Sequence, residues 1–351
     1  MAQSTASLEL ERVVVRPAAP PREVRSDEFT GLLPSHAISP ETLAELHTIN
    51  PWLGVAHVAF EWLCIFGAMA LCQWHWHPLL YVAAVMWIGA RQHALAVLMH
   101  DGAHYRILRS RRWNDVLSET LLAWPLFVTM RSYRRTHFAH HRHVNTSDDP
   151  DWLRKQGGEW RFPKSWRDLL GMLLADALAL NTIQTFAFVL ALSRTGGGDL
   201  KSAARPAAVR KEHLYVACRL AYTVALIGGL AWAGLLVPFL IYWMVPLLTW
   251  FKMILRVRSI AEHFAVENDH VYTATRTTYP SWFERLFVAS KNVNYHLDHH
   301  LYPAVPFYRL PKLHALLMES APFREKAHCT RTYWGVLREC VNHGRTMNVE
   351  R

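Results

Sequence analysis

Four apolar segments, arranged as two pairs, dominate the pattern of hydrophobic and polar positions along the chain. The first pair is Trp52 to Cys72 and Pro78 to Met99. The second pair is Tyr215 to Leu235 and Leu236 to Leu255. Each segment is close to the roughly 20 apolar residues that an α-helix needs to cross a bilayer. The pattern predicts an all-α integral membrane protein with four transmembrane helices in two hairpins.

The distribution of Lys and Arg predicts the side of the membrane on which the hairpins open. The outer turns, Gln73 to His77 and the Ala233 to Pro238 region, carry no Lys or Arg, whereas Arg106 to Arg167 carries many. Positive charge marks the cytoplasmic side of a membrane protein. We therefore expect a multi-pass protein of a bacterial inner membrane with both termini in the cytoplasm. The formal net charge of +10 follows from this asymmetry, and we expect no nucleic-acid partner.

Three histidine clusters carry the candidate chemistry of the chain. They read HDGAH, HFAHH and HLDHH, and their histidines are His100, His104, His137, His140, His141, His296, His299 and His300. On a helix, residues three or four apart lie near one face, so each cluster places its imidazoles together. Neutral imidazole binds iron, copper, zinc and nickel, and eight imidazoles are about twice what one tetrahedral ion uses. The clusters predict a dinuclear metal site in a cytosolic helical cap.

A fifth apolar stretch, Leu169 to Leu192, is long enough to span a bilayer. A crossing here would put the second and third histidine clusters on opposite sides of the membrane, which a shared metal site forbids. Asp176, Asn181 and Gln184 also interrupt the stretch. We therefore interpret it as an interfacial or protein-packed helix.

The regions before and after the apolar segments predict an arm and a tail. Residues 1–50 contain prolines and charges but no apolar run of signal-peptide length, so we expect a cytosolic amino-terminal arm. We assign residues 51–318 to the membrane domain and residues 319–351 to a cytosolic carboxy-terminal tail. Thr195 to Lys211, which is Gly-rich and then basic, is typical of an exposed connector.

Polar residues inside the second apolar segment are candidates for a substrate pocket. Arg91, Gln92 and His93 lie there, and polar groups within a membrane span normally face the protein interior or a cavity. They either line the pocket or form hydrogen bonds between helices. Aromatic residues that either line an apolar tunnel or serve in packing and at the membrane interface are Trp87, Trp124, Phe127, Trp243 and Trp250.

The three clusters, in this order around two apolar pairs, resemble the membrane fatty acid desaturase and hydroxylase superfamily. The resemblance runs from about Trp52 to Leu313 and includes the run Thr146 to Asp151 and the string NYHLDHHLYP from Asn294 to Pro303. Within the superfamily, the chain looks most like the bacterial branch of rhizopine- and rhizobitoxine-related desaturases. The resemblance implies a further metal-ligating histidine, which here is His263 in RSIAEH.

The resemblance also implies two iron ions, dioxygen as cosubstrate and electrons from an external ferredoxin, rubredoxin or cytochrome with its reductase. Four basic residues, which would either steer an acidic carrier or contact lipid head groups, are Arg131, Arg134, Arg135 and Arg142. Neutral ligands leave the charge of two ferrous ions uncompensated, so we expect carboxylates to accept hydrogen bonds from the outer imidazole N–H groups. The candidates are Asp101, Asp149, Asp151, Glu262 and Asp298.

The expected activity is dioxygen-dependent desaturation of an aliphatic substrate, with a membrane lipid acyl chain ahead of a small amino-acid-like metabolite. A hydroxylase or ketolase of the same superfamily is the alternative, because the same metal chemistry can add oxygen to the substrate. A membrane metalloprotease is a distant alternative, since HxxxH suits zinc but Asp101 replaces its usual glutamate.

Overall fold

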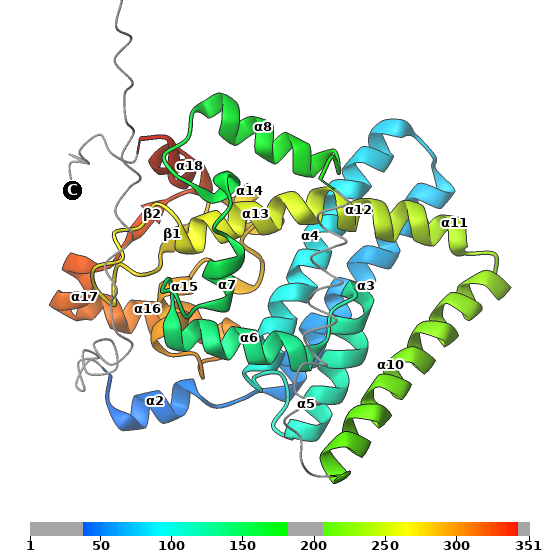
Figure 1. Ribbon diagram of the computed structural model, residues 1–351, viewed down its shortest axis with the longest axis horizontal. Coiled ribbons are helices and arrows are strands. Elements are labelled where there is room, and N and C mark those ends of the chain that lie inside the picture. Colours follow the sequence, from blue (N-terminus) through cyan, green and yellow to red (C-terminus); the bar gives the residue numbers. More distant parts are fainter. Residues whose placement is uncertain (1–37, 182–205, 343–351) are drawn as a thin grey trace, which may run out of the picture.

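Four helical spans in the described part of the chain are long and apolar enough to cross a membrane (Figure 1). The structure is a computed structural model that describes residues 38–181 and 206–342. The spans are Pro40–Trp74, Pro78–Ala103, Glu212–Trp232 and Leu236–His263. Each contains or overlaps one of the four apolar segments, which confirms the predicted number of candidate membrane helices. The helices within them are α2 (Pro40–Leu46), α3 (Pro51–Trp74), α4 (Pro78–Ala103), α10 (Pro206–Trp232), α11 (Leu236–Phe239), η5 (Leu240–Met244), α12 (Val245–Leu248) and α13 (Trp250–His263).

Proline and a polar cap define where α3 and α4 begin. Asn50 accepts a hydrogen bond from the Leu53 amide before Pro51, and the His77 side chain accepts one from the Leu79 amide before Pro78. Proline suits the first helical position because its missing N–H would have no partner there. Only residues 75–77 separate the two helices, so they pack on each other, with Cys72 Sγ 3.8 Å from the Leu80 carbonyl oxygen.

Helix α4 is the axis of the structure, because every residue from Ile88 to Ala103 is buried. Its neighbours α3 and η5 supply Ile65 and Trp243 to the same apolar cluster. The approach to α13 is closest at Gly89, where a Cβ atom would lie 2.9 Å from both the Phe251 amide nitrogen and the Trp250 Cβ. Glycine therefore lets the helix that carries the first histidine cluster sit directly against α13.

The fourth span is broken by a π-helical turn, η5, and by a non-helical residue, Thr249 (φ −116°, ψ −93°). Such breaks leave backbone groups without helical partners, which neighbouring side chains must satisfy inside a membrane. Gln92 on α4 does so by donating to the Trp243 carbonyl oxygen at 2.9 Å. For Gln92, the predicted hydrogen bond between helices is therefore present.

Short helices and two strands, many of them near the last turns of α4 and α13, complete the described fold (Figure 1). They are α5 (Arg111–Leu117), η1 (Ser118–Ala123), η2 (Trp124–Leu126), α6 (Met130–His143), α7 (Pro150–Arg154), η3 (Gly158–Trp160), α8 (Trp166–Ala177), β1 (Thr277–Tyr279), α14 (Trp282–Phe287), η6 (Ser290–Asn292), α15 (His296–Leu301), η7 (Phe307–Arg309), α16 (Leu310–Glu319), α17 (Ala321–Lys326), β2 (Cys329–Arg331) and α18 (Tyr333–Asn342).

The fifth apolar stretch begins as a helix that packs on protein. Leu169 and Leu173 of α8 are buried in one cluster with Ile260 of α13. Asp176 is fully buried beside the Arg256 guanidinium, and Lys252 Nζ lies 3.2 Å from the same carboxylate. Asp176, one of the polar residues that argued against a crossing, thus joins α8 to α13 through ion pairs. Residues 182–192 of the stretch and 195–205 of the expected connector lie outside the described residues, and residues 206–211 form the start of α10.

The chain after α13 departs from two of the expectations. The fold is not entirely α-helical, since β1 and β2 form a two-stranded parallel sheet with Thr278 opposite Thr330. Residues 321–342 are not a separate tail, because they form α17, β2 and α18, and Val336 and Cys340 are buried against α13. The segment has no long apolar run from which this packing could be predicted.

Before α3, Leu46 of α2 is buried with Leu297 of α15, so part of the expected arm also belongs to the folded body.

Replacing Gly89 by Ala is expected to lower the free energy of unfolding by about 1–3 kcal/mol, because the new methyl group meets backbone rather than a movable side chain. The matched control is Gly67→Ala on α3, where a Cβ atom would meet nothing within 4 Å. Thermal unfolding of the two purified variants in detergent, followed by Trp fluorescence, measures the difference. Equal transition temperatures would contradict the close approach of α4 and α13.

Candidate metal centre

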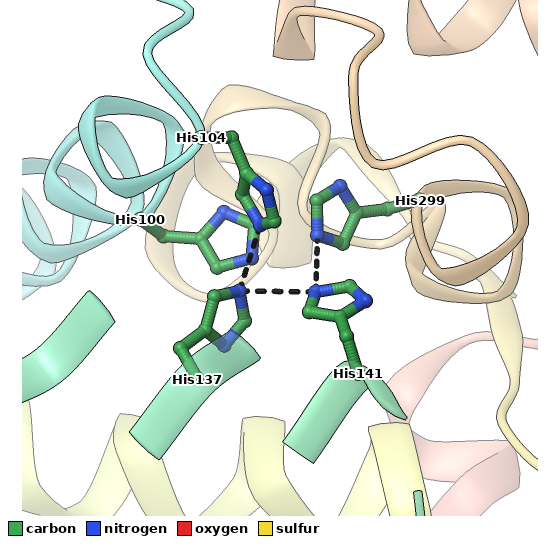
Figure 2. Close-up of side chains that lie close together, drawn as sticks. All are labelled: His100, His104, His137, His141 and His299. Atoms are coloured by element: carbon green, nitrogen blue, oxygen red, sulfur yellow. Dashed lines mark hydrogen bonds between the residues drawn. The ribbon is translucent and has the colours of Figure 1, made fainter. Parts of the chain in front are cut away.

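Five imidazoles converge in the first cluster, which we call site 1 (Figure 2). Its Nε2 atoms approach one another in a chain: His104 to His137 at 2.9 Å, His137 to His141 at 3.0 Å and His141 to His299 at 3.1 Å. The fifth member, His100, places its ring centre 4.3 Å from that of His299. All five possible ligand atoms lie within 4.8 Å of one another.

Four imidazoles form the second cluster, site 2, directly beside the first. Its members are His140, His263, His296 and His300. His296 Nε2 lies 2.9 Å from His263 Nε2 and 3.0 Å from His300 Nε2. The structure thus brings together all nine histidines named from the sequence, including the one that only the resemblance implied.

The spacing HxxHH distributes each histidine cluster of the sequence over both sites. On α6, His137 and His141 are four residues apart and face site 1, while His140 faces site 2. On α15 the assignment is reversed, because His296 and His300 face site 2 and His299 faces site 1. Helix α4 and its cap residue serve site 1 alone, and α13 serves site 2 alone.

The surroundings keep His104, His137, His299 and His300 neutral, which is the form that binds metal. Burial, and after it the neighbouring imidazoles, holds the pKa of His137, His299 and His300 well below the ordinary value. Burial, with Arg106 and Arg134 nearby, lowers the pKa of His104 to about 3. Protonation therefore does not compete with metal binding near neutral pH.

The donor set fits two metal ions. Buried imidazole nitrogens without a hydrogen-bond partner include both of His100 and the Nδ1 atoms of His141 and His263. Buried polar atoms without partners are costly, and a metal ion would relieve that cost at the nitrogen of His100 that it binds. Two nitrogens that bind one ion at about 2.0–2.1 Å and about 90° apart lie about 2.9 Å from each other, which matches the Nε2 spacings.

Asp149 hydrogen-bonds one imidazole from outside, and Glu262 lies beside another. Asp149 Oδ2 lies 2.8 Å from His140 Nδ1 and also accepts the Asn145 amide. Glu262 Oε1 lies 3.4 Å from His296 Nδ1. A proton held on Nδ1 leaves Nε2 free to face the metal. Both carboxylates were among those expected from the sequence.

The other predicted carboxylates have different partners. Asp101 Oδ2 accepts the Phe307 amide at 2.8 Å, and its Oδ1 lies 3.5 Å from His100 Nδ1. Asp298 accepts from Thr277 Oγ1 at 2.6 Å and contacts His314 Nδ1 at 2.8 Å, which ties α15 to β1 and α16. Asp151 forms an ion pair with Lys155, one helical turn further along the chain. The hydrogen bonds of these three carboxylates in the described structure therefore stabilise the protein around the centre rather than its imidazoles.

Comparison with known proteins bears directly on this centre. The sequence model of the family described as "Fatty acid desaturase" matches residues 74–332, which include all nine histidines. The chain belongs to the fatty acid desaturase family. It is therefore an oxidoreductase of the membrane desaturase and hydroxylase superfamily, as the resemblance indicated. This membership removes the metalloprotease alternative.

Three relatives show the range of this desaturase family. The chain is 28% identical over 331 residues to dihydrorhizobitoxine desaturase of Bradyrhizobium elkanii, covering 90% of this chain and 88% of the relative. It is 21% identical over 300 residues to a chloroplastic omega-6 fatty acid desaturase of Brassica napus, covering 80% and 62%. It is 24% identical over 270 residues to a beta-carotene ketolase of a Paracoccus species, covering 75% and 87%. The similarity to the first relative agrees with the bacterial branch named from the sequence.

Sequence reasoning missed three residues near this desaturase-type centre. His314 contacts Asp298 and also the Tyr279 hydroxyl at 2.8 Å, and nothing in its spacing singled it out. Glu61 and Lys291 are buried and form an ion pair close to the centre. Glu61 could have been identified from the sequence, because it is a carboxylate inside an apolar segment, where ionisable residues are rare.

Replacing His263 by Ala is expected to halve the metal bound after loading with excess iron, because His263 belongs to site 2 alone. The matched control is His143→Ala, since His143 lies on the same α6 helix as three site residues but belongs to neither site. Metal per chain, measured by elemental mass spectrometry on purified protein, distinguishes the variants. Loss of metal in His143→Ala, or full retention in His263→Ala, would contradict the division into two sites.

Proposed function

We propose that the chain is a dioxygen-dependent desaturase that introduces a double bond into an aliphatic substrate at a centre of two iron ions. The observation that carries this proposal is the convergence of nine largely buried imidazoles into adjoining groups of five and four. Membership of the fatty acid desaturase family supplies the reaction class.

The iron ions would supply the activation of dioxygen that removes hydrogen from an unactivated C–H bond, chemistry that no side chain provides. The protein's part is to hold neutral imidazoles in place and to exclude bulk water. Asp149 holds the His140 ring through Nδ1, and Glu262 Oε1 lies 3.4 Å from His296 Nδ1. A cavity of about 10 Å³ beside both sites is bordered by His299 of site 1, His296 of site 2 and apolar residues such as Val97. We place the reacting carbons next to this cavity, which itself has room for about one water molecule.

We infer that the four spans form two hairpins in a bacterial inner membrane and that the metal centre lies on the cytoplasmic side. The turn at residues 75–77 and the one at 233–235 carry no Lys or Arg, whereas the region around α5 and α6 is strongly basic. Exposed apolar side chains along α3 and α10, such as Phe66 and Val224, suit contact with lipid.

Electrons would come from a separate carrier protein and its reductase at the cytoplasmic face. Among the basic residues considered for docking, Arg131 pairs with Glu212 and Arg134 with Asp115. Arg142 is exposed and follows His141 directly in the chain. An acidic carrier that binds there would lie close to the metal centre.

The names of the relatives suggest two substrate classes and one alternative reaction for this chain. Their names refer to omega-6 fatty acids and to dihydrorhizobitoxine, so an acyl chain and a small metabolite are both candidate substrates. The two classes differ at the carboxyl end, because an esterified acyl chain has no free carboxylate. Ketolase activity, as named for the Paracoccus relative, is the alternative, because the same centre can return oxygen to the substrate.

Cells that express the chain are expected to consume dioxygen and to accumulate a product two hydrogens lighter than its precursor. Mass comparison of lipid and polar extracts with those of His141→Ala cells identifies the product, because that variant lacks a site 1 imidazole. Anaerobic incubation should stop the conversion. A product with one oxygen from heavy dioxygen and no double bond would move the assignment to hydroxylase, and conversion without dioxygen would contradict the proposal.

A cysteine placed at exposed His75 is expected to react with a membrane-impermeant maleimide in intact cells, because the 75–77 turn would lie outside the cytoplasm. A cysteine at exposed Gln156, between the second histidine cluster and α8, should react only after permeabilisation. Labelling of the unaltered protein gives the background from its native cysteines. The reverse pattern would contradict the proposed orientation.

A further inference from the structure

Three charged side chains are buried together within and beside the first two spans. Glu61 of α3 contacts Lys291 of η6 at 2.5 Å (Oε1 to Nζ) and Arg91 of α4 at 3.2 Å (Oε2 to Nη1). The side chains of Glu61, Arg91 and Lys291 are only 0%, 6% and 8% exposed. Ionisable residues inside membrane spans are costly and mark functional sites more often than structural ones.

The group is electrostatically incomplete, because two cations face one carboxylate. His57 Nδ1, 2.9 Å from Lys291 Nζ, adds a polar neighbour rather than a second carboxylate. The two carboxylate oxygens of Glu61 have no hydrogen-bond partner of good geometry. The Nε atom of Arg91 also has none. A buried charge without a full set of partners is costly, so an added anion would stabilise this group.

Lys291 connects the charged group to the metal centre. It borders the cavity of about 10 Å³ that His100, His296 and His299 also line. Its backbone is left-handed (φ 57°, ψ 36°), a conformation that non-glycine residues adopt only where surrounding contacts enforce it. The following residue, Asn292, is also left-handed and donates its side-chain amide to the Phe307 carbonyl oxygen at 3.1 Å. The loop is thus held in a strained form that directs Lys291 toward the cavity.

We propose that Lys291, with Arg91 beside it, binds the carboxylate of the substrate, and that the substrate is a small molecule whose reacting carbons lie a few bonds from that carboxylate. The inference rests on the proposed function, since it assigns the substrate class of the same centre. Lys291 borders the same cavity as His100, His296 and His299, so a carboxylate bound by Lys291 would lie close to carbons that face the imidazoles. An esterified lipid has no free carboxylate and would leave the excess positive charge uncompensated.

Two sources of a carboxylate are compatible with this chemistry. A short free fatty acid offers the carboxylate alone. An amino-acid-like molecule also offers an ammonium group. Glu61 lies beside both cations that would bind the carboxylate, so it could accept a hydrogen bond from that ammonium group. The two sources differ in their dependence on Glu61.

The test is binding to purified full-length, iron-loaded protein without dioxygen or reductant, so that no turnover is required. The probes are hexanoate, L-norleucine and hexan-1-ol, which all have six carbons, and calorimetric titration gives their affinities. Both cations favour an anion, so at least one carboxylate should bind at least tenfold more tightly than hexan-1-ol. Lys291→Met should reduce that preference at least tenfold and leave the affinity for hexan-1-ol unchanged. The matched control is Lys312→Met, which removes a half-exposed ion pair with Glu45.

Each outcome decides the inference. Tighter binding of L-norleucine that Glu61→Gln removes would support an amino-acid-like substrate, and tighter binding of hexanoate that Glu61→Gln leaves intact would support a short free fatty acid. Equal affinity for hexan-1-ol and both carboxylates would overturn the inference on the unaltered protein, even if Lys291→Met does not fold. Undiminished carboxylate binding in folded Lys291→Met would overturn it as well. Carboxylate binding without any dioxygen-dependent conversion would leave this site standing and contradict only the proposed function.

Discussion

The need to give partners to nine clustered imidazole rings constrains the rest of the structure. Burying such a cluster with its ring nitrogens unpaired is costly, and metal ions at the inward nitrogens would lower that cost, helped by carboxylates such as Asp149 on the outward ones. The architecture follows from bringing the four helical elements that carry these rings to one place. The glycine contact between α4 and α13 and the burial of α4 serve that end.

Helix α4 joins the two kinds of chemistry that the structure contains. Its last turn carries His100, and Arg91 lies on the same helix nearer the middle of the span. The imidazoles are neutral and contribute no charge to balance metal ions, whereas the group around Glu61 has one cation in excess. Both regions therefore favour negative charge in a molecule that occupies the space between them, and this is the electrostatic character that we assign to the substrate.

Much of the site, and less of the fold around it, could be predicted from the sequence. The histidines were recognisable because helical spacing places them together, and the spans because apolar runs of about 20 residues are typical of membrane helices. The five-to-four division was not predictable, because it depends on how α6 and α15 face each other. The parallel pairing of β1 with β2 and the burial of Cys340 escaped prediction because they join short segments far apart in the chain. For the same reason the partnership of Glu61 with Lys291 appears only in three dimensions.

The crossed assignment of histidines on α6 and α15 has a consequence for assembly of the centre. Each of these helices contributes rings to both sites, so an ion bound at either site restrains the two helices that the other site also needs. The ordering entropy lost with the first ion is then not lost again with the second. Loading of two metal ions would accordingly be cooperative, and at limiting metal a half-filled protein would be scarce.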